Sequence, residues 1–131
     1  MILHINTSKT WRGGEQQLYY LARGLFLRKI SQLIICQPES ELEKKCIESS
    51  IPFISIKMRS ELDFKAINAI KEIIPKYNIK LIHTHTAKAH TIGLLVKRKF
   101  PELMLVVSRR VDFHIGKNPF SKLKYKSKLN D

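Results

Sequence analysis

Ile2-Leu3-His4-Ile5-Asn6 is a short apolar strand, and it runs through a polar turn into Gly13-Gly14-Glu15, where an amphipathic helix begins. This order of strand, glycine-containing turn and helix N-terminus decides the fold. Glycines let a ligand approach the backbone closely, and the first N–H groups of a helix point at an anion. The stretch therefore predicts the opening unit of an α/β sheet that can hold a diphosphate.

The glycine pair by itself is weakly specific. A dinucleotide-binding turn needs the pattern Gly-x-Gly-x-x-Gly, whereas Gly13 and Gly14 are adjacent and no third glycine opens the helix. Adjacent glycines followed by Glu15 suit a sugar nucleotide better. The alternative interpretation is a plain loop with a tight turn.

Beyond this turn, strands and helices alternate along the chain. Apolar spacing predicts strands over 2–6, 33–36, 52–56, 80–83 and 104–108, and helices over 15–29, about 41–50, 64–74 and about 89–96. Ser40 is the expected N-cap of the second helix, and Pro75 is expected to help end the third. Because parallel neighbours require crossover connections, the predicted fold class is α/β, a Rossmann-like parallel sheet with helices on both faces.

Length and composition predict one globular domain. The chain has 131 residues, 44% of them hydrophobic, and no apolar run approaches the ~18 to 20 residues of a membrane span. Polar residues interrupt the first ten positions, so no secretion signal is predicted and the expected location is cytoplasmic. Cys36 and Cys46 lack the spacing of a redox or zinc site and are expected to be buried or idle thiols.

Much of the net charge of +13 lies late in the chain. Between Lys97 and Lys128 ten basic residues face two acidic ones, with Phe113, Phe120 and Tyr125 among them. Such a stretch favours contact with an anionic membrane surface, whereas no RNP, KH or helix-turn-helix pattern supports nucleic-acid binding. A solvated, lysine-rich surface is the alternative interpretation.

The unusual residues fall where the predicted strands end. Gly13 and Gly14 follow the first strand, the His83-Thr84-His85 stretch follows the fourth, and Arg109 and Arg110 follow the fifth. Ligands of parallel sheets bind at this carboxyl edge, so the three segments are expected to converge. Both imidazoles would lie on one side if the strand continues through them. Hydrogen bonds to sugar hydroxyls or phosphate are favoured for this pair. A metal site is a less favoured alternative, because no Cys, Asp or Glu joins the histidines in sequence, and an exposed or merely structural pair is the other.

These residues resemble a known family. The strand and glycine turn, the stretch Leu81-Ile82-His83-Thr84-His85-Thr86-Ala87-Lys88-Ala89 and the stretch Val106-Val107-Ser108-Arg109-Arg110 are similar to the N-terminal, acceptor-side domain of family 4 glycosyltransferases of the GT-B type. The middle stretch is the most specific part. The resemblance spans nearly the whole chain and implies retaining sugar transfer from a nucleotide-diphosphate sugar without a catalytic metal.

The resemblance also implies roles for single residues. Gly13, Gly14 and Glu15 would face the donor phosphates, His83, Lys88 and Arg109 would bind the acceptor, and His85 and Arg110 would be catalytic. The family often has a histidine where Arg110 stands. An arginine stays cationic and cannot shuttle protons near neutral pH.

The resemblance predicts residues 1–113 as the Rossmann-like domain, one incomplete GT-B half, and residues 114–131 as a basic tail continuing it. The donor-binding C-terminal half is missing from the sequence, so the chain alone is expected to be inactive, with a possible second half supplied in trans. Leaving-group stabilisation in that half supplies much of the catalysis.

The predicted function is the acceptor half of a glycosyltransferase in cell-envelope polysaccharide or lipopolysaccharide synthesis. Its expected partners are a glycan or lipid-linked acceptor, a nucleotide sugar and the inner face of an anionic membrane, with no separate cofactor. Two rival hypotheses are a non-catalytic half that binds anionic glycan, lipid headgroup or a partner subunit, and a basic nucleic-acid-binding protein.

Overall fold

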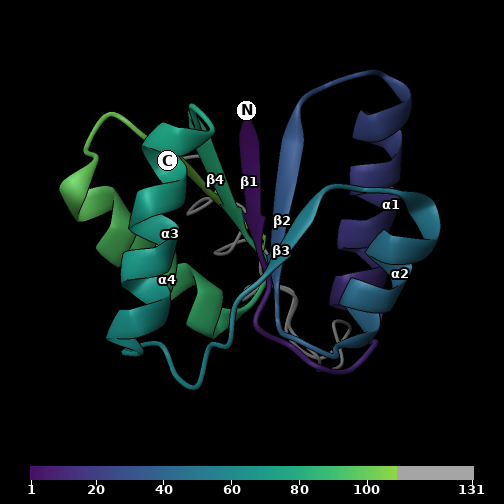
Figure 1. Cartoon of the computed structure of the whole chain (residues 1–131), viewed down its shortest axis with the longest axis horizontal. Helices are drawn as coiled ribbons and strands as arrows, with labels where there is room; N and C mark the ends of the chain where they lie inside the picture. The colour runs from purple at the N-terminus through teal and green to yellow at the C-terminus, as the bar shows by residue number, and fades with distance from the viewer. Residues whose placement is uncertain (109–131) are drawn as a thin grey trace, which may run out of the picture.

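In the computed structural model, which describes residues 1–108, strands and helices alternate from end to end (Figure 1). The elements are β1 (Ile2–Ile5), α1 (Gly13–Leu27), β2 (Gln32–Cys36), α2 (Glu41–Ser49), β3 (Phe53–Ser55), α3 (Phe64–Lys76), β4 (Leu81–Thr84), α4 (Ala87–Lys99) and β5 (Met104–Val107). Each lies within a few residues of the element predicted from apolar spacing. Arg109 and Arg110, the end of the predicted domain at 113 and the basic tail lie outside the described residues.

The five strands form one parallel sheet in the order β3-β2-β1-β4-β5. Helices α1 and α2 cover one face, and α3 and α4 cover the other (Figure 1). This arrangement confirms the predicted α/β class. β1 occupies the centre of the sheet because β2 and β4 both pair with it.

Two apolar cores lie on opposite faces of the sheet. Leu3 and Ile5 of β1 and Ile82 of β4 pack in the larger core, under α3 and α4. Ile34 and Cys36 of β2 pack in the smaller core, under α1 and α2. Successive side chains of a strand point to opposite faces. The polar residue between Leu3 and Ile5, His4, therefore points to the α1 side, and so does His83, which follows Ile82.

Helix ends follow the local signals in the sequence. Ser40 Oγ accepts a hydrogen bond from the N–H of Glu43 at 3.1 Å, which confirms Ser40 as the N-cap of α2. Asp63 and Thr86 cap α3 and α4 in the same way. Helix α3 includes Pro75 and ends one residue later, because proline removes a backbone donor and does not support a further turn.

Cys36 and Cys46 are free, buried thiols, as predicted. Burial raises the pKa of Cys36 to about 11 and that of Cys46 to about 12. A thiol with so high a pKa carries almost no thiolate at neutral pH. Neither residue is therefore a candidate nucleophile.

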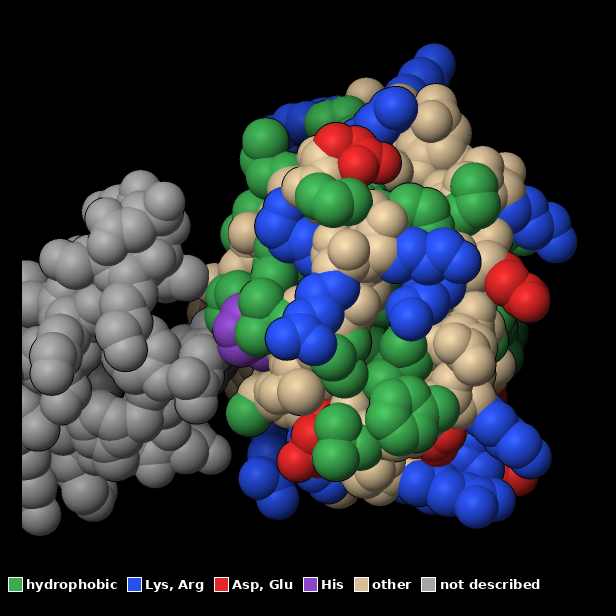
Figure 2. All heavy atoms as spheres, turned by 90° about the vertical axis from the view of Figure 1, so that its left-hand side faces the viewer, with side chains coloured by type: hydrophobic (Ala, Val, Ile, Leu, Met, Phe, Trp, Pro, Cys, Tyr) green, Lys and Arg blue, Asp and Glu red, His purple; other side chains and the backbone are tan. Residues whose placement is uncertain are grey.

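The first part of the basic stretch is at the end of α4. Lys97, Arg98 and Lys99 occupy its last turn, where positive charge complements the helix dipole. Lys97 Nζ donates hydrogen bonds to the carbonyl oxygens of Pro101 at 2.7 Å and Leu103 at 2.6 Å. Figure 2 shows Lys and Arg side chains spread over the α3–α4 face. The lysines from 117 to 128 lie outside the described residues, so the predicted membrane contact stays a prediction.

Across residues 1–108, no helix is both long and apolar enough to cross a membrane.

Gly93 is the point of closest approach between α4 and the sheet. A Cβ atom added there would lie 2.9 Å from Thr84 Cγ2 and 3.1 Å from Leu105 Cδ1. Thr84 is fully buried, so it has little room to move. Gly24 in α1 is different: an added Cβ would meet the flexible side chain of the exposed Arg28, at 3.3 Å from Nη1.

This contrast predicts opposite effects of the same substitution at two helical glycines. Gly93→Ala should lower the free energy of unfolding by about 1 to 2 kcal/mol, because overpacking against the sheet outweighs the gain in helix propensity. Gly24→Ala should raise it by up to about 1 kcal/mol, because there the propensity gain acts alone. Urea unfolding followed by circular dichroism measures both. A stabilised Gly93→Ala protein would contradict the close packing.

Candidate functional site

Buried polar contacts fix the turn that follows β1. Asn6 is fully buried, and its Nδ2 donates to Glu15 Oε2 at 3.2 Å while its Oδ1 accepts from the N–H of Ser8 at 2.8 Å. Glu15 Oε1 accepts from the N–H of Arg12 at 3.1 Å. The carboxylate of Glu15 therefore ties the end of β1 to the start of α1. The structure gives Glu15 these partners, and its predicted contact with donor phosphates stays a prediction.

Helix α1 begins at Gly13, two residues before the predicted start. Its N-cap is Arg12, whose own N–H is bound by Glu15, so both glycines lie inside the first turn. The first N–H groups of an α-helix have no partner within the helix. Gly13 is exposed and Gly14 is half-buried, which leaves the backbone of this turn open to a ligand.

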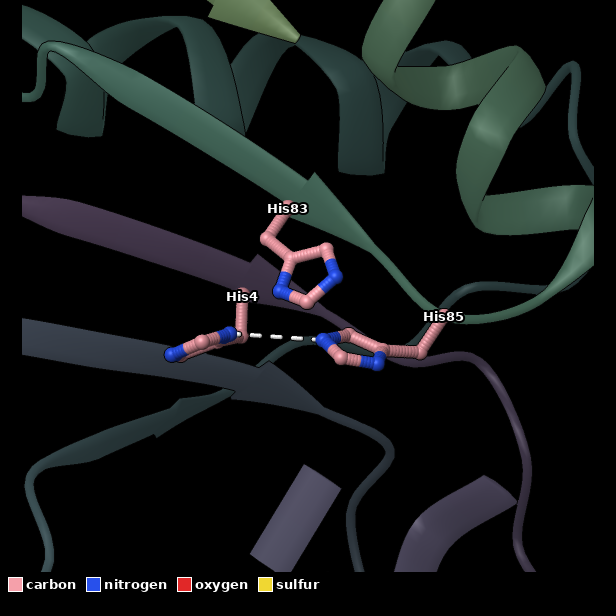
Figure 3. Close-up of side chains that lie close together, drawn as sticks. All are labelled: His4, His83 and His85. Carbon is pink, nitrogen blue, oxygen red and sulfur yellow. Dashed lines mark hydrogen bonds between the residues drawn. The ribbon is translucent and has the colours of Figure 1, made fainter. Parts of the chain in front are cut away.

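Three histidines meet on the α1 side of the sheet, at its carboxyl edge (Figure 3). His4 of β1 lies opposite His83 of β4 in the parallel register. The ladder continues one step past β4, because the N–H of His85 donates to the carbonyl oxygen of Ile5 at 3.1 Å. The rings of His83 and His85 lie on the same side, with centroids 3.9 Å apart, and His4 Nδ1 lies 3.3 Å from His85 Nε2.

Neighbouring polar side chains hold two of these rings. Gln32 Nε2 donates to the carbonyl oxygen of Ala22 at 2.6 Å, which directs its Oε1 toward His4 Nε2 at 3.1 Å. His4 therefore carries its proton on Nε2 and presents the lone pair of Nδ1 to His85. On the other side, His83 Nε2 lies 2.7 Å from Ser108 Oγ.

Burial keeps all three imidazoles neutral at physiological pH. It lowers the pKa of His4 to about 4, and the nearby His83 adds to this effect while the hydrogen bond to Gln32 opposes it. The pKa of His85 falls to about 2, through burial first and then the charges that His83 and His4 would carry. The pKa of His83 is also lowered by burial. Neutral rings can donate or accept hydrogen bonds and bind metals, but they cannot neutralise an anion.

A cleft of about 370 Å³ opens beside the histidines. It is lined by the first turns of α1 and by the carboxyl edge of the sheet: Gly14, Gln17, Leu18, Tyr20, Leu21, His83, His85 and Ser108. The predicted convergence of the first and fourth strand ends is thus observed. A small ligand held here would touch the helix N-terminus and an imidazole together.

The other predicted residues lie elsewhere. Gly13 adjoins the cleft without lining it, and Lys88 is exposed in the first turn of α4 and is not among the cleft-lining residues. Arg109 and Arg110 lie outside the described residues. Sequence reasoning missed His4 and Gln32; the signal was present, because each is a polar residue in an otherwise apolar strand.

Comparison with known proteins supplies the wider context. The family model described as Glycosyltransferase Family 4 matches residues 11–128. No curated protein matches the chain at a significant level.

Several solved structures share the fold. A glycosyltransferase from Rickettsia africae ESF-5 is 23% identical, with a TM-score of 0.69, over 95% of this chain and 32% of that one. Anabaena Alr3699/HepE in complex with UDP-glucose is 17% identical, with a TM-score of 0.64, over 98% and 34%. MurG of Acinetobacter baumannii is 11% identical, with a TM-score of 0.67, over 95% and 38%. The chain thus spans about a third of the length of these proteins.

The lowered histidine pKa values predict a loss of stability in mild acid. Each histidine binds protons more weakly in the folded chain than in the unfolded chain, where its pKa is about 6.5. The stabilisation is therefore complete above about pH 6.5 and is lost as the pH falls toward the folded values. We expect the free energy of unfolding to fall by up to about 1.4 kcal/mol per pH unit for each histidine.

Urea unfolding between pH 7.5 and 5, with a chelator present, measures this slope. The hydrogen-bond partners of the three rings in residues 1–108 are one another, Gln32 and Ser108, so no carboxylate offsets their protonation. His85→Asn should give a shallower slope than the parent protein. A stability that does not change over this pH range would contradict the neutral, buried cluster.

Proposed function

The chain belongs to glycosyltransferase family 4, and we propose that it forms the acceptor-binding half of a retaining enzyme that uses a nucleotide-diphosphate sugar. One observation carries the proposal: Gly14 of the first turn of α1 and His83 and His85 at the end of β4 line the same cleft. A helix N-terminus suits a phosphate, and neutral imidazoles suit hydroxyl groups. A sugar attached to a diphosphate offers both.

The glycine turn is the proposed contact for the donor phosphates. Gly14 has no side chain to cover the backbone. The side chains of Asn6 and Glu15 hold the turn in place by binding each other and the N–H groups of Ser8 and Arg12, rather than those of Gly13 and Gly14. A phosphate at this turn would be bound by backbone donors and by the helix dipole. Such a contact requires no movement of the fold.

His85 is proposed to hydrogen-bond the acceptor hydroxyl, with His83 beside it. A pKa of about 2 makes His85 a weak base, so its contribution is positioning and hydrogen bonding rather than proton abstraction at neutral pH. His83 is held by Ser108, which fixes the ring against the cleft. Positive charge for the leaving diphosphate would then come from arginine, and Arg110 stays the predicted residue.

The remaining parts of the proposal concern the whole enzyme. The donor would be bound mainly by a C-terminal half, in the same polypeptide or in trans, so residues 1–131 alone would not turn over. HepE is described in complex with UDP-glucose, which favours a UDP-sugar as the donor class. We place the reaction in cell-envelope polysaccharide or lipopolysaccharide synthesis, at the cytoplasmic face of an anionic membrane that presents a lipid-linked acceptor.

The site assignment predicts where a nucleotide sugar touches the chain. UDP-glucose added to the ¹⁵N-labelled chain, with EDTA present to exclude metal effects, should shift the amide signals of Gly13, Gly14 and His85. Gly14→Val should weaken this binding about ten- to a hundredfold, corresponding to about 1.5 to 3 kcal/mol for a lost anion contact. Gly24→Ala, a change in the same helix but away from the cleft, serves as the matched control.

Two outcomes would contradict the proposal. Shifts that gather away from the cleft, or that survive Gly14→Val unchanged, would remove the site assignment. Release of nucleoside diphosphate from a UDP-, GDP- or ADP-sugar by the purified chain alone would contradict its role as one half of the enzyme.

A further inference from the structure

We propose that His4, His83 and His85 form a binding site for a divalent transition metal, with Zn²⁺ preferred, on the cleft side of the sheet. This inference goes beyond the proposed function, and it rests on the three side chains rather than on glycosyl transfer. Each ring offers one nitrogen, and the three nitrogens lie within 4.8 Å of one another. Figure 3 shows the rings turned toward a common point.

The spacing of the nitrogens suits zinc. A tetrahedral Zn²⁺ ion with Zn–N bonds of about 2.0–2.1 Å holds neighbouring ligand nitrogens about 3.3 Å apart. His4 Nδ1 and His85 Nε2 are 3.3 Å apart. His83 lies within 4.8 Å of both, so a small side-chain rotation brings the third nitrogen into range.

The supporting contacts have the arrangement found around metal-binding histidines. Such a histidine usually donates its second ring N–H to a carbonyl or other oxygen, which fixes the tautomer and aims the free lone pair. His4 Nε2 donates to Gln32 Oε1, and Gln32 is itself fixed by Ala22. His83 Nε2 contacts Ser108 Oγ, which leaves Nδ1 as the nitrogen that faces the other rings.

The hydrogen bonds leave a ligand lone pair in place on His4. A metal must displace any proton from the ligand nitrogen, and the hydrogen bond from His4 Nε2–H to Gln32 Oε1 leaves Nδ1 of that ring without a proton. Without metal, His85 Nε2–H donates to His4 Nδ1; with metal bound, that proton moves to His85 Nδ1, and the ring stays neutral. Three imidazoles with no oxygen ligand favour zinc or a similar transition metal over Mg²⁺ or Ca²⁺.

The fourth coordination position would open on the cleft. His83 and His85 both line it, opposite Gly14 at the start of α1. Three protein ligands with one open position are typical of zinc sites that bind a water or a ligand oxygen. The sequence alone did not favour a metal site, because no Cys, Asp or Glu joins His83 and His85 there. The third ligand, His4, comes from β1, far from them in sequence.

Cobalt substitution tests the geometry, and zinc competition tests the affinity. The untagged chain, freed of metal with a chelator and then dialysed, is titrated with Co²⁺ and then with Zn²⁺. We expect one Co²⁺ per chain with the intense visible absorption of a four-coordinate ion, displaced by one equivalent of Zn²⁺. Zinc binding should also raise the melting temperature, because the metal binds the folded chain preferentially, and EDTA should reverse this rise.

Variants assign the ligands. His85→Asn and His83→Asn, each checked for folding by circular dichroism, should weaken zinc binding by more than about 100-fold, which exceeds the usual cost of losing a supporting contact. Gln32→Met, which removes the acceptor of His4 Nε2–H, should weaken it about 10- to 100-fold. The double variant His90→Asn/His114→Asn removes the two histidines outside the cluster and should bind zinc like the parent.

Several results of the metal titrations would contradict the proposed site. Absence of stoichiometric Co²⁺ or Zn²⁺ binding, a six-coordinate cobalt spectrum, or undiminished binding in folded His85→Asn protein would overturn the proposal. Loss of binding in the His90→Asn/His114→Asn protein would overturn it as well. Because the readout is metal binding, these results are independent of the UDP-glucose titration, which is made with EDTA present.

Discussion

The parallel pairing of β1 with β4 is the constraint on which the rest of the structure depends. It joins the first strand to the fourth at the centre of the sheet and sets His4 beside His83 in register. A slip of one residue would move every side chain of β1 to the opposite face, placing Leu3 and Ile5 among the polar groups and His4 in the apolar core. The larger core under α3 and α4 therefore enforces the register, and the register assembles the histidines. Apolar packing on one face of the sheet thus sets the positions of the histidines on the other face.

Buried hydrogen bonds hold both walls of the cleft in place. The turn after β1 is held by Asn6 and Glu15, both buried, so the start of α1 cannot drift away from the strand that it follows. The histidines are held from the sheet side, through Gln32 and Ser108. Each wall is thus fixed by its own contacts. A ligand between them meets two prearranged surfaces, and little ordering has to accompany binding.

Much of the fold could be predicted from the sequence because its signals are local. Apolar spacing identified the alternating elements, and Ser40 identified a helix start through its side chain. The start of α1 was less accessible, since the capping contact between Glu15 and Arg12 draws Gly13 and Gly14 into the first turn. The site was predicted in part: the histidines of β4 stand close together in sequence, whereas His4 and Gln32 join them only through strand pairing across the sheet. Contacts that depend on the pairing of strands far apart in sequence cannot be predicted from the local spacing of residues.

The outer edge of β5 is a position where the sheet could accept another strand. Within residues 1–108, β5 pairs with β4 alone, and two of its four side chains, Met104 and Val106, are 61% and 39% exposed on the face away from α4. A strand edge of this kind carries backbone donors and acceptors that are ready to pair with another strand. A strand added there would extend the sheet on the side of Ser108 and the histidines, while the other edge, β3, is short and distant from them. An added strand paired with β5 would therefore place new backbone beside the cleft without altering β1 and β4, which carry the histidines.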